Sequence, residues 1–150
     1  GYAVPKYQNI TSNGNPGSNP TFPDTDYPMF RLAEAYLTYA EATVRLEGSA
    51  DSRSVELLND LRERAGLPGD LAAGDITLEF LLDERGRELF WEATRRTDLI
   101  RFGQYTGGDY LWPWKGNSQA GTAIDAELAL YPLPASELRA NPNQEQNPGY

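Results

Sequence analysis

Cysteine and histidine are both missing from this sequence of 150 residues. Without cysteine the chain cannot form a disulfide bond, and it has no thiolate nucleophile. Without histidine it lacks the side chain that usually gains and loses a proton at neutral pH, and also the commonest ligand of transition metals. These two absences exclude cysteine- and histidine-based catalysis and the usual transition-metal sites.

Positive charge and long apolar runs are also scarce. Lysine and arginine number 13 against 22 acidic residues, which gives a net charge of −9. Nucleic acids and anionic lipid surfaces both need a basic protein surface, so the composition argues against either partner. No apolar run approaches the roughly 20 residues that cross a bilayer. The chain opens with GYAVPKY rather than with an initiator Met or a signal peptide, so we interpret it as a fragment or a processed product.

The residues that are present suffice for a folded body. The hydrophobic fraction is 39% and the aromatic fraction 11%, and a compact domain of this length buries about 70% of the surface of its unfolded chain. Five of the eleven prolines fall in residues 1–28, together with many Asn, Ser and Gly. This composition favours turns. We predict an ordered arm over 1–28, in which Tyr2, Tyr7 and Phe22 pin the loop to its surroundings.

Apolar residues at steps of three and four predict three helices. They are expected at about 29–46, 51–65 and 78–102, and together they form a helical core over 29–103. The first two are joined by a short turn and make an antiparallel hairpin. A single pair of this kind exposes an apolar stripe that it cannot bury alone, so it needs neighbouring helices.

Local start and stop signals set the expected ends of these helices. Asp26, just ahead of a proline, is the predicted cap of the first helix, and Gly48 ends that helix. Asp51 caps the second helix, and Gly66 takes the positive φ that ends it. The third helix begins after Thr77.

Residues 104–150 are rich in turn-forming residues and show no helical period. We expect a loop-rich region there, with one short extended piece and one helical turn near LYPLPASEL. No β-sheet of any size is predicted. The fold class is therefore mainly α, with a helix hairpin, a third charged helix, long ordered loops and little or no β structure.

The third predicted helix has the densest charge in the chain. Acidic and basic residues three or four positions apart predict ion pairs along one helical face. The expected pairs are Glu84–Arg87, Glu92–Arg96 and Asp98–Arg101. In a second interpretation, Arg95 and Arg96 bind a carboxylate or phosphate group of a ligand. We favour the face of ion pairs, because each arginine has an acidic neighbour within reach.

The segment DYLWPWKGN places Tyr110, Trp112 and Trp114 among Pro and Gly, where no helix can run. Aromatic rings cover the flat C–H patches of sugars, and the nearby Asn117 and Gln119 offer groups for hydroxyls, so the three aromatic residues are candidate ligand-binding residues. Trp112 and Trp114 point to opposite sides of an extended chain, so that one ring can bind while the other anchors. The alternative, which we favour, is that both rings pack as a small satellite core.

Five stretches stand out for their order and spacing. They are GYAVPKY, DYPMFRLAEAYLTYAEATVRLEG, LLNDLRERAGLP, LLDERGRELFWEATRRTDLIRFG and LYPLPASELRANPNQEQNPGY. Together they resemble the C-terminal part of the SusD/RagB family over nearly the whole chain. The closing NPGY is similar to the natural C-terminus of that family, so we expect the missing sequence to lie before Gly1.

This resemblance implies a fold built around tetratricopeptide-like helix pairs, of which the chain is the C-terminal part of a larger single domain. It implies a surface-exposed lipoprotein of the bacterial outer membrane, anchored through an N-terminal Cys that this fragment lacks. The implied function is non-catalytic: the protein binds oligo- or polysaccharide, or peptide, and delivers it to a TonB-dependent, SusC-like transporter. No cofactor and no metal are expected, and most ligand contacts of the family precede Gly1.

Two other functions remain open. A generic helical-repeat module would bind a protein or peptide on its concave face. A carboxylate-dependent glycoside hydrolase would need a specific acidic pair, and sequence proximity selects none among 22 acidic residues. The acidic stretch Asp24–Asp26 suggests a contribution to a calcium site, but it lacks the further spaced oxygen ligands of such a loop.

Overall fold

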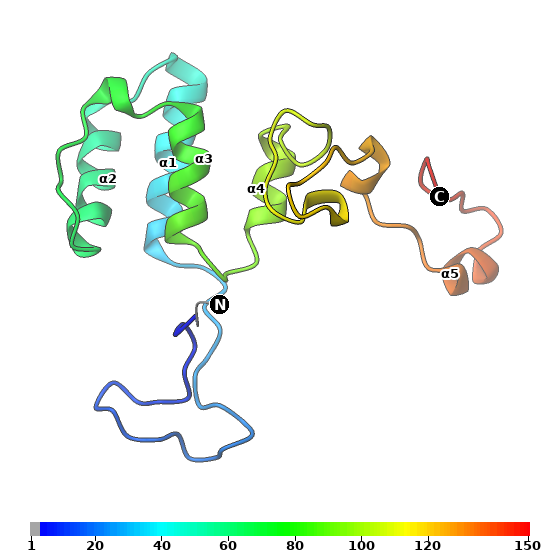
Figure 1. Cartoon of the computed structure of the whole chain (residues 1–150), viewed down its shortest axis with the longest axis horizontal. Helices are drawn as coiled ribbons and strands as arrows, with labels where there is room; N and C mark the ends of the chain where they lie inside the picture. The colour runs from blue at the N-terminus through cyan, green and yellow to red at the C-terminus, as the bar shows by residue number, and fades with distance from the viewer. Residues whose placement is uncertain (1–3) are drawn as a thin grey trace. The chain divides into compact units, whose positions relative to one another are not determined.

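The computed structural model describes residues 4–150 (Figure 1). Tyr2, predicted to pin the arm, lies outside the described residues. Residues 4–150 contain five α-helices and no β-strand, and their β-type pairing is limited to two isolated bridges, Ile10–Pro16 and Gly107–Ile124. The predicted mainly α class is therefore confirmed. None of the helices in this described part has the length and apolar character needed to cross a membrane.

The chain divides into two compact units, the first ending at Thr94 and the second running from Arg95 to Tyr150. The helices of the first unit are α1 (Leu32–Glu47), α2 (Ser52–Arg64) and α3 (Leu78–Glu88). Those of the second are α4 (Arg95–Arg101) and α5 (Ala135–Ala140). Short 3₁₀ turns occur at Ala73–Asp75, Lys115–Asn117 and Ala126–Ala129. The second unit therefore begins inside the predicted third helix.

Helix α1 is the centre of the first unit, because it packs against both α2 and α3 and runs antiparallel to each (Figure 1). The predicted hairpin is thus present, and α3 supplies a neighbour for it. Side chains from all three helices form one apolar core. Its buried members are Ala33, Leu37, Ala40, Val44, Ala50, Leu58, Leu61, Ile76, Leu81 and Leu89.

The apolar face predicted for the first helix, which includes Leu32, Tyr39 and Leu46, is largely exposed on α1, and the core uses another face of the helix. The exposed apolar side chains on α1 and just before it are Met29, Phe30, Leu32, Tyr39 and Leu46. A depression of about 450 Å³ runs along this face, from Phe30 to Ala42. The three helices of the first unit therefore leave one side of α1 without an apolar neighbour in the described residues.

The local signals for helix ends are confirmed at four positions. Gly48 ends α1 in the left-handed region with φ 80°, and Gly66 follows α2 with φ 78°. The Asp51 side chain accepts a hydrogen bond from Ser54 N at 2.7 Å, and Thr77 makes the equivalent bond at the start of α3. These groups satisfy backbone atoms that a helix end leaves without an intrahelical partner.

The predicted start of the first helix at about residue 29, with Asp26 as its cap, is wrong. Helix α1 begins at Leu32, after Arg31 in an extended conformation (φ −148°) that provides no side-chain cap. The Arg31 side chain instead reaches the far end of α3, where its guanidinium binds Glu88 and Glu92. The residue before α1 thus takes part in a non-local ion pair and not in a local helix cap.

The single helix predicted over 78–102 is also wrong. It is interrupted by a turn over residues 89–94, where Trp91 (φ 62°) and Ala93 (φ 58°) occupy the left-handed region. An α-helix cannot pass through such residues, and side chains other than glycine pay a steric cost there. In addition, the last carbonyl of α3, that of Glu88, accepts a hydrogen bond from Arg31. The helical period continues through this turn in the sequence, but the helix does not.

The N-terminal arm is held by only part of the predicted aromatic set. The ring of Tyr7 lies 5.7 Å from that of Tyr27, so Tyr7 packs as expected. Phe22 is among the exposed apolar residues and does not pin the arm. Polar bonds order the loop instead: Asp24 accepts from Ser18 N and Ser18 Oγ, at 2.7 and 2.6 Å.

Candidate functional site

The segment from Gln104 to Ile124, called the aromatic loop below, carries the three candidate ligand-binding residues. Its ends meet where Gly107 N donates to the Ile124 carbonyl at 2.8 Å. Its tip is a tight turn in which Trp114 N donates to the Ser118 carbonyl at 2.9 Å. These bonds lie within the loop itself, so the loop sets its own backbone shape.

Two glycines allow this turn to close. Gly116 and Gly121 have φ of 59° and 81°, in the region that favours glycine. A Cβ on Gly116 would lie 2.5 Å from the Thr122 methyl carbon, and one on Gly121 would lie 2.6 Å from the Trp112 carbonyl oxygen. Any side chain at either position would push the two sides of the turn apart.

Trp112 is the inner ring of the aromatic loop. Its indole stacks with Tyr105, at 6.1 Å between centroids, and meets Tyr110 at 6.2 Å. The Lys115 ammonium lies 4.6 Å from its centroid. The Tyr110 hydroxyl in turn accepts a hydrogen bond from Arg95 at 2.7 Å. Trp112 and Tyr110 are therefore held by contacts within the second unit and act as anchors of the loop.

Trp114 is the outer ring. It is 65% exposed, its φ is 72°, and within the described residues its indole has no ring or cation partner. Asn117 and Gln119 follow it with exposed side-chain amides that likewise lack a hydrogen-bond partner in residues 4–150. The favoured prediction that both rings pack in a satellite core is therefore wrong for Trp114. The two tryptophans have different environments, and of the two only Trp114 presents a free indole face.

Lys115 is a residue of the loop that the sequence argument missed. Its side chain is only 1% exposed, and its ammonium donates to the carbonyls of Tyr110 at 2.7 Å and Thr106 at 3.5 Å. The only local signal for this role is an isolated lysine that follows two tryptophans and precedes a glycine. That signal is too weak to distinguish a buried cation from an ordinary surface lysine.

The arginines at the start of α4 bind within the protein. Arg96 lies between the rings of Tyr105 and Tyr131, 5.1 and 4.2 Å from their centroids. It also donates to the carbonyls of Leu128 and Ala129, at 3.2 and 2.9 Å. Its guanidinium therefore links α4 to the segment near Tyr131, by a cation–π contact that a sequence pattern of ion pairs does not predict.

Two of the three predicted ion pairs are confirmed. Arg87 binds Glu84 at 2.7 Å, and Arg101 binds Asp98 at 2.9 Å. The third prediction, Glu92 with Arg96, is wrong because the Glu92 carboxylate accepts from Lys6 and Arg31 instead. The error has the same origin as the misplaced helix: the turn at 89–94 removes the helical spacing that the prediction assumed.

A second polar assembly, called the charge cluster below, joins the elements of the first unit. It consists of Lys6, Arg31, Arg64, Glu88 and Glu92. Arg31 binds Glu88 at 2.5 Å and Glu92 at 2.7 Å. Arg64 also binds Glu88, at 2.6 Å, and Lys6 binds both Glu92 and the Phe90 carbonyl. The N-terminal arm, α1, α2 and the end of α3 thus meet at two nearly buried carboxylates.

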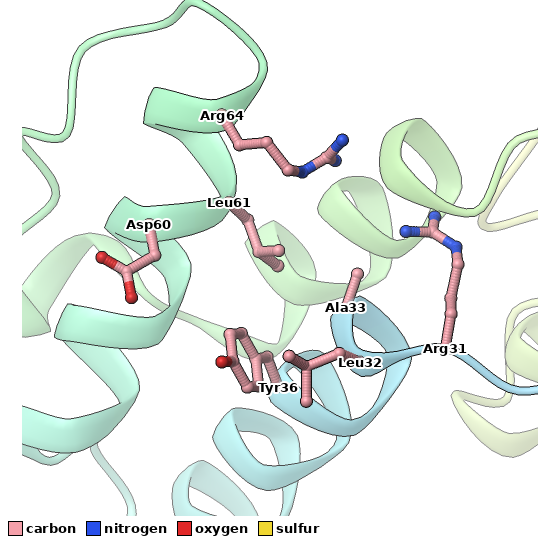
Figure 2. A pocket seen from close by; sticks show the side chains of 7 residues that line it. All are labelled: Arg31, Leu32, Ala33, Tyr36, Asp60, Leu61 and Arg64. Carbon is pink, nitrogen blue, oxygen red and sulfur yellow. The ribbon is translucent and has the colours of Figure 1, made fainter. Parts of the chain in front are cut away.

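A pocket of about 370 Å³ lies beside this cluster. Its lining comes from the first turns of α1 and the last turns of α2 (Figure 2). Arg31 and Arg64 line it, but both guanidinium groups are engaged by Glu88. The rest of the lining is mainly Leu32, Ala33, Tyr36 and Leu61, with Asp60 on α2. The pocket therefore offers an apolar surface rather than a site for an anion.

The charge cluster should make the first unit sensitive to acid. Burial raises the pKa of Glu92, but hydrogen bonds from Arg31 and Lys6 outweigh it, and the pKa lies below its ordinary value of 4.5. A carboxyl group whose pKa is lower in the folded than in the unfolded state stabilises the fold at pH values above its unfolded pKa. This contribution is lost as the pH falls through the pKa of the folded state. We therefore expect the free energy of unfolding to decline below about pH 5.

Glu92→Gln should flatten this acid dependence and lower the stability at neutral pH, as measured by urea unfolding across a pH series. Glu56→Gln, at an exposed ion pair with Arg53, is the matched control and should leave the pH profile unchanged. An unaltered profile in Glu92→Gln would show that other carboxyl groups govern the acid response.

The acidic residues of the described part of the chain do not gather into a metal site. No group of three or more His, Cys, Asp or Glu residues within 4–150 has the arrangement to hold an ion. Both oxygens of Asp24, the residue considered for calcium, accept hydrogen bonds from Ser18. The outward-facing indole of Trp114 is therefore the candidate site with the clearest geometry.

The candidate site is thus a free indole on a self-supported loop of a mainly helical chain. The chain belongs to the SusD family, whose family model matches residues 1–150. The curated relatives include the starch-binding protein SusD of Bacteroides thetaiotaomicron, 45% identical over 150 residues, which are 100% of this chain and 26% of the relative. They also include the SusD-like protein P25 of Formosa agariphila, 34% identical over 135 residues, 83% of this chain and 24% of the relative.

Solved structures show the same similarity. The surface glycan-binding protein A of Bacteroides uniformis matches with a TM-score of 0.65 and 30% identity, over 81% of this chain and 27% of that one. A SusD superfamily protein of Parabacteroides distasonis matches with a TM-score of 0.61 and 30% identity, over 81% and 26%. The chain thus spans about a quarter of the length of its relatives. The predicted family is confirmed.

Proposed function

We propose that this protein binds glycans without transforming them and that the aromatic loop takes part in binding. The observation that carries the proposal is the free indole of Trp114, 65% exposed, on a loop held in shape by its own contacts. An indole face covers the C–H patch of a sugar ring, and neighbouring amides can meet its hydroxyls. Two similar proteins, one named for starch binding and one for surface glycan binding, support the same ligand class.

The proposal includes the place and the partner that membership of this family suggests. The protein is surface-exposed at the bacterial outer membrane, is lipid-anchored through an N-terminal Cys, and passes oligosaccharide to a TonB-dependent, SusC-like transporter. Labelling of intact cells and co-purification from outer membranes test these points. A protein recovered only from the cell interior, or without any such transporter, would contradict them.

Trp114→Ala should weaken polysaccharide binding by the complete protein about fivefold, because one aromatic stacking contact contributes about 1 kcal/mol. Affinity gel electrophoresis with soluble starch as the first probe measures this. Trp91→Ala is the matched control, since Trp91 is 61% exposed but lies outside the aromatic loop. Equal retardation of Trp114→Ala and the wild type would remove the aromatic loop from the binding site.

The same preparations separate glycan binding from the two other functions. Release of reducing ends from a polysaccharide panel would indicate a hydrolase and overturn the non-catalytic proposal. Binding of a protein or peptide but of no polysaccharide would favour the helical-repeat interaction module instead. We expect retardation by a polysaccharide and no release of reducing ends.

A further inference from the structure

Within residues 4–150, the buried ammonium of Lys115 has no carboxylate partner. Its contacts are the carbonyls of Tyr110 and Thr106 and the indole face of Trp112, 4.6 Å away. An ammonium has three N–H donors, so two carbonyls and one π face account for all three. A cation that is 1% exposed and lacks an ionic partner is costly to bury. The two carbonyl dipoles and the indole face of Trp112 must therefore offset that cost.

The backbone of Lys115 also makes hydrogen bonds within the aromatic loop. Lys115 N donates to the Trp112 carbonyl at 3.0 Å, and the Lys115 carbonyl accepts from Thr122 N at 3.0 Å and Ser118 N at 3.3 Å. Main chain and side chain together connect Lys115 to residues on both sides of the turn. Trp114 stands directly before this residue, so a well-placed Lys115 fixes where the Trp114 backbone lies.

We propose that Lys115 is a positioning residue: its ammonium orders the aromatic loop from within and thereby presents Trp114 to a neutral glycan. The inference rests on the proposed function. The turn is already ordered in the absence of a ligand, so binding does not have to supply the entropy cost of ordering it. The ligand class follows from charge. The only charged residues of the loop are Asp109 and Lys115, and the positive one is buried, so the loop offers no exposed cation to an acidic sugar.

The first test needs no variant, because Lys6 and Lys115 are the only two lysines of the chain. Brief treatment of the folded protein with acetic anhydride, read by mass spectrometry, should acetylate Lys6 at least about tenfold faster than Lys115, since reaction at a buried amine requires local opening. The Lys6 side chain is 32% exposed. Equal acetylation of the two amines would overturn the internal role of Lys115.

The second test uses Lys115→Met, which retains most of the length of the side chain, one atom fewer, and removes its charge. Hydrogen exchange should become faster in residues 104–124 and stay unchanged in α1 to α3, whereas Lys6→Met should not affect 104–124. Unchanged exchange in the loop of Lys115→Met would refute the proposal. If Lys115→Met does not fold, Lys115→Gln, which also removes the charge, replaces it with the same expected and contradicting results.

The third test connects position to binding. Lys115→Met should weaken starch binding about as much as Trp114→Ala, roughly fivefold, and the double variant should be no weaker than either one alone. Additive losses would mean that Lys115 does not act through Trp114.

Stronger retardation by the acidic probe polygalacturonate than by starch would overturn the neutral ligand class. If the wild type bound neither probe, the proposed function would fail, while acetylation and exchange would still test the ordering of the loop.

Discussion

Leu37→Ala is expected to lower the free energy of unfolding by about 3 kcal/mol, the typical cost of removing a fully buried leucine side chain. Leu37 is 0% exposed and lies in the core that α1 shares with its neighbours. Truncation removes buried apolar surface and leaves a cavity that rigid helices on two sides cannot fill. Urea unfolding followed by far-ultraviolet circular dichroism measures the loss.

Leu46→Ala is the matched control for this prediction. It makes the same chemical change in the same helix, but at a side chain that is 84% exposed. We expect a loss below about 0.5 kcal/mol, the usual range for surface positions. If the two variants lost equal stability, the outer face of α1 would be packed in the protein under test, and our account of its core would be incorrect.

The contrast between Leu37 and Leu46 also shows what the sequence could predict. The two residues are nine positions apart and therefore lie on opposite faces of α1, and apolar residues occur on both faces. The pattern identifies a helix but does not state which of its apolar faces has a neighbour. The ends of the helices were easier to predict from the sequence. Gly48 and Asp51 act through their own backbone and the next few residues, so their effects can be derived without knowledge of the fold.

The interruption at residues 89–94 could not be predicted in the same way. Trp91 and Ala93 occupy the left-handed region, yet neither residue type favours it, and no glycine marks the turn. The end of α3 is also bound by Arg31, a residue far away in the chain. A contact between residues more than fifty positions apart leaves no signature in a local pattern.

The aromatic loop is an intermediate case. The spacing of Trp112 and Trp114 predicts that the two rings face different ways, but it does not tell which ring is free. That depends on Tyr105, which stacks with Trp112, and on the buried position of Lys115. Whether Trp114 binds a ligand remains a prediction for the binding assay.

Arg31→Met is expected to destabilise the first unit by roughly 2 kcal/mol. Arg31 binds both carboxylates of the charge cluster and a carbonyl of α3. The side chains of Glu88 and Glu92 are only 10% and 6% exposed. Without Arg31, each of these two carboxylates has one cation fewer to bind it. A fully orphaned buried charge costs about 3 to 5 kcal/mol. The smaller value follows because Arg64 and Lys6 keep their bonds to these two groups.

Arg53→Met is the control, because Arg53 forms an ion pair with Glu56 in which both side chains are more than half exposed. Solvent screens that pair, so urea unfolding should detect no change. High salt should likewise weaken the Arg31 contribution only slightly, since the carboxylates it binds are nearly buried. Equal stability of Arg31→Met and the wild type would mean that Lys6 and Arg64 alone hold Glu88 and Glu92.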